Sequence, residues 1–524
     1  MVFTVILMVV FFASMIGVGL YCRKHSTDVN GFVLGGRSVG PWLTAFAYGT
    51  SYFSAVIFVG YAGQFGWNFG MASTWIGLGN AFIGSLLPWV ILGRRTRVMT
   101  QHLESKTMPD FFGKRFDSDR LKIAASVIVF VFLIPYTASL YNGLSSLFNI
   151  AFDIPYWAVI AVMAALTCAY VIFGGYMATA INDFIQGIIM LIGIIAVIVA
   201  VITDNGGFMN AYNELAVIDT GNGINGGFAS FLGPDPFFLF IVVILTSLGT
   251  WGLPQMVGKF YSIKNEESIK KGTIISTIFA IIVAGGCYFL GGFGRLYDDV
   301  VTRTASGGVL FDSIIPAMLK ALDKDIIVGI VIVLVLAASM STLSSLVLTS
   351  ASTLALDVIA PKCKKEMSEK TKLITLRVLI LFFVVVSAVI AILKDMFPGF
   401  TFIAQMMGVS WGALAGAFLA PFLYGLYWKK VTKSAVAVSF VVGATISILQ
   451  LLVTIGIITM PNGFLGDVMF KTSLHSGVFA MVGGLIFVPI ASLITPKICK
   501  EKVDEMFKCY DKDVVVPFTE HLGK

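Results

Sequence analysis

The chain has 524 residues, of which 57% are hydrophobic and only 12% are charged, and its mean hydropathy is +0.91. Soluble domains carry about 25% charged residues, so this composition excludes a soluble globular protein and indicates an all-α polytopic membrane protein. The formal net charge of +7 does not indicate a nucleic-acid partner, because the basic residues follow the membrane topology described below. The six cysteines form no CxxC pair and the four histidines lie far apart, which indicates reduced thiols and no metal site of that kind.

Thirteen segments are apolar and long enough to cross a membrane, since a helical span needs roughly 20 residues. In chain order they are 2–22, 40–61, 69–93, 123–148, 155–173, 176–202, 235–258, 272–294, 326–353, 374–393, 400–427, 434–457 and 476–496. The first segment has no basic region before it and is followed by Arg-Lys, so we interpret it as a transmembrane helix and not as a secretory signal.

The lysine and arginine residues predict the orientation of these spans. With the N-terminus outside, 30 of the 36 basic residues fall on the inner side, including the segment from Lys259 to Lys271 that follows the seventh span. The six outer ones are Arg295, Arg303, Lys320, Lys324, Lys394 and Lys471. The positive-inside rule therefore predicts an outer N-terminus and a cytosolic C-terminus.

Two spans contain helix-weakening residues in their middle. The second span contains "AYGTSYFSAV" over 47–56, and the seventh contains "TSLGTWGLPQ" over 246–255. Unpaired backbone at membrane depth is tolerated where it lines a cavity, so breaks in corresponding spans point to a binding site, with ordinary kinks as the alternative. Spans 2–6 and 7–11 are two sets of five. Because five is odd, the second set begins on the opposite side of the membrane from the first, which predicts an inverted repeat.

The ninth span contains the hydroxyl-rich stretch "AASMSTLSS" over 337–345. At 100° per residue, four of its five hydroxyls share a helical face with Ala338: Ser341, Thr342, Ser344 and Ser345. Beside free carbonyls from a broken helix, such hydroxyls suit a hard cation, which prefers oxygen ligands. A single serine more often bonds back to its own helix or joins two helices.

Asp183, in "GGYMATAINDFIQG" of the sixth span, is the one clearly intramembrane acid of the sequence. An ionisable side chain within a span is a candidate functional group. The alternative is an interfacial acid at the start of the helix. If Asp183 lies near Ser344 and Ser345, the three form a second and more anionic cation site.

Four stretches together resemble the sodium/solute symporter family over about residues 1–500. They are "FVLGGRSVGPWLTAF", "GGYMATAINDFIQG", "GLPQMVGKFYS" and "AASMSTLSS". The resemblance implies a leucine-transporter-type fold, in which a five-plus-five inverted repeat has one extra helix before it and two after it. It also implies co-transport of one or two sodium ions by alternating access.

The resemblance further implies two sodium sites. The first would use the backbone carbonyls of Thr50, Phe53 and Ala338 with the hydroxyls of Ser341 and Thr342. The second, present in some members, would use Asp183, Ser341, Ser344 and Ser345. The family's proline carriers have an aspartate directly after the serine of the broken span, whereas Tyr52 follows Ser51 here.

The solute is expected to be small and neutral or zwitterionic, with an amino acid such as proline favoured, because the sequence places no basic residue or second acid at the membrane midplane. The candidate lining residues are Tyr52, Ser54, Tyr136, Asn142, Thr246, Thr250, Trp251, Gln405 and Trp411. A sugar, pantothenate or another carboxylate remains an alternative solute, and a proton-coupled transporter is a less favoured alternative mechanism. No pattern of an intramembrane enzyme occurs in the spans, so we expect a transporter and not an enzyme.

These expectations divide the chain into six parts. They are residues 1–39 (first helix and inner loop), 40–202 (first repeat), 203–234 (outer loop), 235–427 (second repeat), 428–498 (two further helices) and 499–524 (cytosolic tail). We expect a multi-pass protein of a bacterial plasma membrane that functions as a monomer, with the solute, sodium ions and the lipid bilayer as its partners.

Overall fold

The computed structural model describes residues 2–23, 26–152, 155–221, 223–304, 307–322, 325–363, 365–393 and 403–511. Over these ranges the chain is helical and has no β-strand beyond two isolated bridges. Three predicted features lie outside the described residues: the start of the eleventh span at 400–402, the tail residues 512–524, and the outer lysines Lys324 and Lys394.

The first half of the chain supplies the helices from the N-terminus to the long outer loop. They are α1 (Val2–Cys22), α2 (Val29–Leu34), α3 (Pro41–Tyr52), η3 (Val56–Tyr61), α4 (Ala62–Phe69), α5 (Thr74–Ala81), η5 (Phe82–Leu86), η6 (Trp89–Gly93), α6 (Arg94–His102), α7 (Met108–Arg115), α8 (Asp119–Phe152), α9 (Tyr156–Asp204) and α10 (Phe208–Val217).

The second half supplies the remaining helices. They are α11 (Pro236–Leu248), η8 (Gly249–Gly252), α12 (Pro254–Ser262), α13 (Glu266–Ala280), η9 (Ile281–Gly285), α14 (Gly286–Gly291), α15 (Ile314–Ala321), α16 (Asp325–Thr353), η12 (Leu354–Ile359), α17 (Ala360–Lys362), α18 (Glu369–Leu393), α19 (Ile403–Tyr427), α20 (Lys433–Thr454), α21 (Ser473–Ile494) and α22 (Lys500–Phe507).

Ten helical stretches in the described ranges are long and apolar enough to cross a membrane, and the bent pair Pro236–Gly252 and Pro254–Ser262 makes an eleventh. Two of the ten, Val56–His102 and Tyr156–Asp204, are 47 and 49 residues long, about twice the length that one crossing needs. Each is interrupted by a glycine with positive φ, Gly70 at 58° and Gly175 at 56°, a backbone conformation that side chains disfavour.

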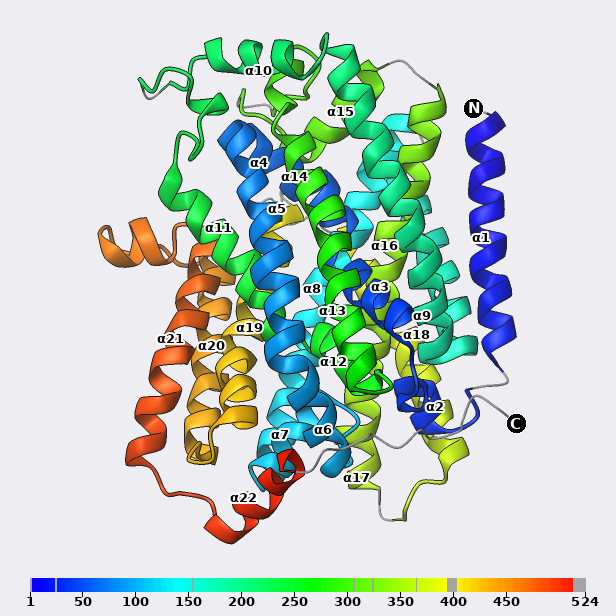
Figure 1. Cartoon of the computed structure of the whole chain (residues 1–524), viewed down its shortest axis with the longest axis vertical. Coiled ribbons are helices and arrows are strands. Elements are labelled where there is room, and N and C mark those ends of the chain that lie inside the picture. The colour runs from blue at the N-terminus through cyan, green and yellow to red at the C-terminus, as the bar shows by residue number, and fades with distance from the viewer. Residues whose placement is uncertain are drawn as a thin grey trace.

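The helices form an elongated bundle with α16 inside it (Figure 1). α16 packs against α9, α8 and α3, and between Val331 and Leu348 its side chains are buried. α20 and α21 pack on α19 at one edge of the bundle, and α1 packs on α9 at the other (Figure 1). This arrangement places the hydroxyl-rich stretch of α16 in the protein interior, away from lipid.

The two ends of the bundle differ in character. The N-terminus lies at the same end as α10 and α15, and α6, α7, α17 and α22 lie at the opposite end (Figure 1). The basic loops that adjoin α6, α7, α17 and α22 therefore lie at one end of the molecule (Figure 1). Local capping matches the sequence there, since the Thr107 hydroxyl accepts the Asp110 amide at the start of α7.

The two predicted helix breaks are present. α3 ends at Tyr52, Phe53 is extended (φ −85°, ψ 113°), and helix resumes at Ala55. In the seventh span, Leu253 is extended (φ −85°, ψ 119°), Pro254 opens α12, and the two segments meet at a 46° bend. Proline explains the second break, because it lacks an amide donor and restricts the residue before it.

Gly49 is not at the first break. It is helical, and a Cβ there would lie 2.4 Å from the Phe279 ring, so its role is to let α13 approach α3.

Candidate functional site

Five oxygen atoms from α16 and the break after α3 converge at one point. The Ser341 hydroxyl lies 3.1 Å from both the Thr50 and the Ala338 carbonyl oxygens. The Thr342 hydroxyl lies 3.1 Å from Thr50 O, 3.4 Å from Phe53 O and 3.2 Å from Ala338 O. These are the five residues that the family resemblance implies for a first sodium site, and all five are buried.

The break in the second span makes this convergence possible. Because Phe53 is extended, the carbonyls of Thr50 and Phe53 lie outside the regular helical ladder and face α16. Ser339, on another face of α16, bonds back to the Val335 carbonyl at 2.8 Å in the manner of an ordinary helix serine. Ser341, Thr342 and Ser345, which the helical-face argument grouped together, contact α3, whereas Ser344 of the same face bonds back to the Ser341 carbonyl.

Asp183 is fully buried and faces a lysine that the sequence interpretation assigned to the cytosol. The Lys259 ammonium lies 3.6 Å from Asp183 Oδ2 and donates a 2.9 Å hydrogen bond to the Ser345 hydroxyl. Lys259 is only 3% exposed. The expectation that no basic residue lies near the sites was wrong, because the bend before α12 turns Lys259 inward toward α9 and α16.

The other hydroxyls proposed for the second sodium site bond elsewhere. Ser344 donates to the Ser341 carbonyl at 2.9 Å, and the Ser341 hydroxyl belongs to the first cluster. Ser345 instead shares a 2.7 Å hydrogen bond with Ser51, which directly follows Thr50 in α3. Of the three serines, only Ser345 is hydrogen-bonded to the Lys259 ammonium that faces Asp183, and Ser51 is a participant that the sequence did not single out.

Four of the predicted solute-lining residues gather beside the α3 break. The Tyr52 and Trp411 rings lie 5.8 Å apart, and those of Tyr136 and Trp411 lie 6.0 Å apart. The Tyr136 hydroxyl is directed at Ser54 and Trp411, yet Tyr136 Oη, Ser54 Oγ and Trp411 Nε1 are buried with no hydrogen-bond partner in the described part of the chain. These three buried polar atoms face one another and can offer hydrogen bonds to a polar ligand, since buried polar groups are nearly always paired.

The remaining candidates are directed elsewhere. Thr250 Oγ1 donates to the Gly84 carbonyl at 3.1 Å, and Trp251 Nε1 donates to the Ile83 carbonyl at 2.8 Å, so both side chains face η5. Thr246 bonds back to Val242 in its own helix at 2.8 Å, and its carbonyl accepts the Tyr52 hydroxyl at 3.0 Å. Asn142 Nδ2 lies 3.6 Å from the Met406 sulfur, beside the half-buried Gln405.

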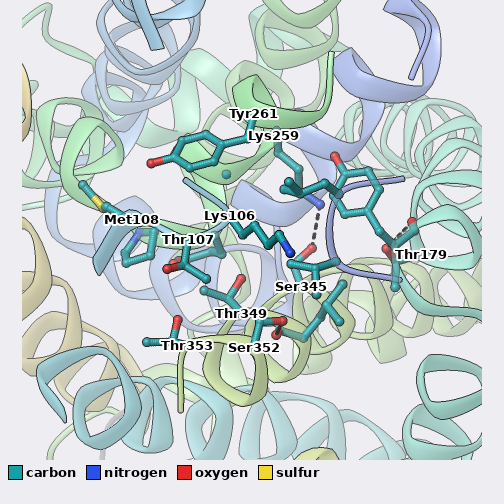
Figure 2. A pocket seen from close by; sticks show the side chains of 17 residues that line it. Lys106, Thr107, Met108, Thr179, Lys259, Tyr261, Ser345, Thr349, Ser352 and Thr353 are labelled. Carbon is teal, nitrogen blue, oxygen red and sulfur yellow. Dashed lines mark hydrogen bonds between the residues drawn. The ribbon is translucent and has the colours of Figure 1, made fainter. Parts of the chain in front are cut away.

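A small cavity of about 50 Å³ lies beside the Lys259–Ser345 pair (Figure 2). Its lining comes from α2, α7, α9, α12 and α16 and combines two lysines with many hydroxyls: Lys106, Lys259, Thr107, Thr179, Tyr261, Ser345, Thr349, Ser352 and Thr353. None of the lining residues identified in the described ranges is a carboxylic acid. One lining residue, Met108, belongs to α7, which lies at the basic end of the bundle (Figure 1).

Comparison with known proteins bears on what this arrangement does. The chain is 27% identical over 504 residues to the osmoregulated proline transporter OpuE of Bacillus subtilis, and the match covers 96% of each chain. It is 29% identical over 455 residues to sodium/proline symporter 2 of Staphylococcus saprophyticus, covering 85% of each.

Solved structures share the fold. A sodium-coupled sialic acid symporter superposes with a TM-score of 0.74 at 16% identity, covering 95% of this chain and 99% of that one. The transporter Mhp1 superposes with a TM-score of 0.50 at 15% identity, covering 91% and 98%. The model of the sodium:solute symporter family matches residues 32–443, which include the α3 break, Asp183, Lys259 and the hydroxyl-rich stretch of α16. The chain belongs to the sodium:solute symporter family.

Proposed function

We propose that this protein takes up a small zwitterionic solute, with proline as the leading candidate, together with sodium by alternating access across a bacterial plasma membrane. Membership of the family makes sodium the co-transported ion. The observation that carries the proposal for this chain is the convergence of five neutral oxygens between α3 and α16.

The spacing of these oxygens supports an ion at their centre. Oxygen ligands that share a hard cation at about 2.3–2.6 Å lie about 3.3–3.7 Å apart when their bonds are perpendicular. The observed separations of 3.1–3.4 Å are close to these values. When the ion binds, the two hydroxyls turn their lone pairs toward it. The carbonyl oxygens then coordinate the ion and no longer accept hydrogen bonds from the hydroxyls. Five neutral oxygens hold a monovalent ion weakly enough to release it.

The solute is proposed to bind beside this cluster, at Tyr52, Ser54, Tyr136 and Trp411. Helix resumes at Ala55, next to Ser54, and the positive end of a helix favours a carboxylate. The rings of Tyr52, Tyr136 and Trp411 offer apolar area for the remainder of the solute. Two curated relatives are proline carriers, and a small zwitterion fits this chemistry.

We expect sodium binding and solute binding to be coupled because both sites use the backbone at the α3 break. Phe53 contributes a carbonyl to the sodium site, and the next residue, Ser54, faces the solute region, so each ligand orders the same stretch of backbone. Sodium must favour the state in which the solute site is formed, and the solute must raise sodium affinity by the same factor. An inward-negative potential adds about 2.3 kcal/mol per charge per 100 mV, which drives uptake.

We propose the finer architecture on the same basis: thirteen crossings with the N-terminus outside, and inverted repeats over 40–202 and 235–427. The extended residues Phe53 and Leu253 fall in the opening span of each repeat, which supports the correspondence. The interruptions at Gly70 and Gly175 divide the two longest helical stretches and bring eleven candidate crossings to thirteen. Monomeric function belongs to the same proposal.

The test is uptake of radiolabelled proline into proteoliposomes containing the purified protein. An inward sodium gradient should stimulate uptake, whereas a choline gradient, or a pH gradient without sodium, should not. Competition by unlabelled amino acids, sugars and pantothenate identifies the preferred solute. Uptake driven by the pH gradient alone would contradict sodium coupling, and competition by a sugar but not by proline would replace the leading solute.

A further inference from the structure

The Lys259 ammonium occupies the position at which a second sodium ion would have to bind. It lies 3.6 Å from Asp183 Oδ2 and donates to Ser345 at 2.9 Å, so it contacts two of the residues proposed for that ion. We propose that Lys259 is a tethered cation that replaces the second sodium, so the protein binds and carries one sodium ion per cycle, at Thr50, Phe53, Ala338, Ser341 and Thr342.

The charges around Asp183 favour this assignment. Asp183 is completely buried, and neither carboxylate oxygen accepts a hydrogen bond within the described part of the chain, so the Lys259 ammonium is the counter-charge found there. A sodium ion on the same carboxylate would lie about 4 Å from the ammonium. Repulsion between unit charges at that distance, at an effective dielectric constant of about 20, weakens ion binding by about a thousandfold.

The remaining ligands of a second site are also engaged. Ser344 donates to the Ser341 carbonyl, and Ser341 donates to the first cluster. The neighbouring cavity brings a second lysine, Lys106, and no carboxylic acid among its identified lining residues (Figure 2).

The ammonium also reaches the first sodium site through two hydroxyls. Lys259 donates to Ser345, and Ser345 shares a hydrogen bond with Ser51, the residue after the sodium ligand Thr50. Lys259 therefore holds α9, α12, α16 and α3 together at one point. A bound second sodium would perform this bridging only when present, whereas the tethered ammonium performs it throughout.

Replacing Lys259 by a neutral residue of similar shape should convert the arrangement into a real ion site. In Lys259→Met, Asp183 becomes a buried unpaired carboxylate, which is strongly unfavourable unless a cation joins it. The side chain of methionine is shorter than that of lysine and ends without a charge, so the space of the ammonium becomes available to sodium.

The experiment counts sodium ions bound to the full-length purified protein by equilibrium binding of ²²Na⁺. We expect one ion for the wild type, two for Lys259→Met, one for Lys259→Arg, and one for the double variant Lys259→Met/Asp183→Asn. Adding Thr342→Ala to Lys259→Met should weaken the binding of one of the two ions and leave that of the other unchanged, because Thr342 is a ligand of the first site alone.

The possible outcomes separate this inference from the proposed function on which it rests. Two ions in the wild type, or a single ion in a folded Lys259→Met protein that binds one in the wild type, would overturn the inference while leaving sodium symport intact. No ion in the wild type but one in Lys259→Met would support the tethered cation and contradict the first sodium site, and no ion in either would contradict both. If Lys259→Met does not fold, the Asp183→Asn variant is used instead. One ion bound by both Asp183→Asn and the wild type supports the inference. Binding of one ion fewer by Asp183→Asn than by the wild type refutes it.

The transport ratio gives a second readout. With a zwitterionic solute, a tenfold solute gradient is balanced by a membrane potential of about 59 mV if one sodium ion is coupled, and of about 30 mV if two are coupled. The wild type and Lys259→Arg should follow the first slope, and transport-competent Lys259→Met should follow the second.

Discussion

Removal of the Thr342 hydroxyl is the sharpest test of the first sodium site. This hydroxyl lies 3.1, 3.4 and 3.2 Å from the carbonyl oxygens of Thr50, Phe53 and Ala338, so it is the side-chain ligand in contact with every backbone ligand. Thr342→Ala leaves four of the five oxygens in place. An interaction between a hydroxyl and a charged group contributes about 1.5–3 kcal/mol, which corresponds to about a 10- to 150-fold loss of sodium affinity.

The assay is solute uptake into proteoliposomes as a function of external sodium, with the half-saturating sodium concentration as the measured quantity. Thr342→Ser keeps the hydroxyl, so its half-saturating sodium concentration should stay within about threefold of the wild-type value. Ser339→Ala is the matched control, because Ser339 lies on the same helix, is equally buried and bonds only to Val335 among the described residues.

The result that refutes the reasoning is a half-saturating sodium concentration in Thr342→Ala within threefold of the wild type. An equal shift in Ser339→Ala would refute it as well, because it would attribute the effect to loss of any buried hydroxyl in α16. A higher half-saturating solute concentration should accompany the sodium shift, since the coupling is reciprocal.

The remaining predictions concern the solute region, the packing and the topology. Tyr136→Phe should raise the half-saturating solute concentration about tenfold without lowering the thermal stability of the solute-free protein, because the Tyr136 hydroxyl has no partner in the described part of the chain. Tyr170→Phe loses a 2.8 Å hydrogen bond to Met340 O and should lower the melting temperature instead. A stability loss in Tyr136→Phe and a solute effect in Tyr170→Phe would contradict the proposed solute site. Gly66→Ala should destabilise the protein by about 1–3 kcal/mol or more, because its Cβ would lie 1.9 Å from the Gly291 carbonyl oxygen, whereas Gly285→Ala, with nothing within 4 Å, should melt near the wild type. A membrane-impermeant maleimide should label the exposed Cys363 and Cys499 from the cytosolic side only, and the buried Cys22, Cys168 and Cys287 from neither side; labelling in intact cells would invert the topology.

The sequence by itself determined the bulk organisation of this protein. Long apolar segments must be helices in lipid, and the positions of basic residues order them across the membrane, so the spans could be predicted without coordinates. The shared helical face of Ser341 and Thr342 was also predictable, because it is fixed by the 100° repeat, whereas their carbonyl partners were implied by the family resemblance. Pro254 predicted the second break for an equally local reason.

The tertiary structure alone decided which residues fill the space around Asp183. In sequence, Lys259 stands next to a basic loop and is counted with the cytosolic residues. The extended Leu253 and the 46° bend turn α12 so that this side chain faces α9 and α16. Its partners are 76 and 86 positions away in the chain, so their meeting depends on helix packing, and no local pattern encodes it. The sequence therefore predicted the candidate ligands, and the packing places the Lys259 ammonium beside one of them, Asp183.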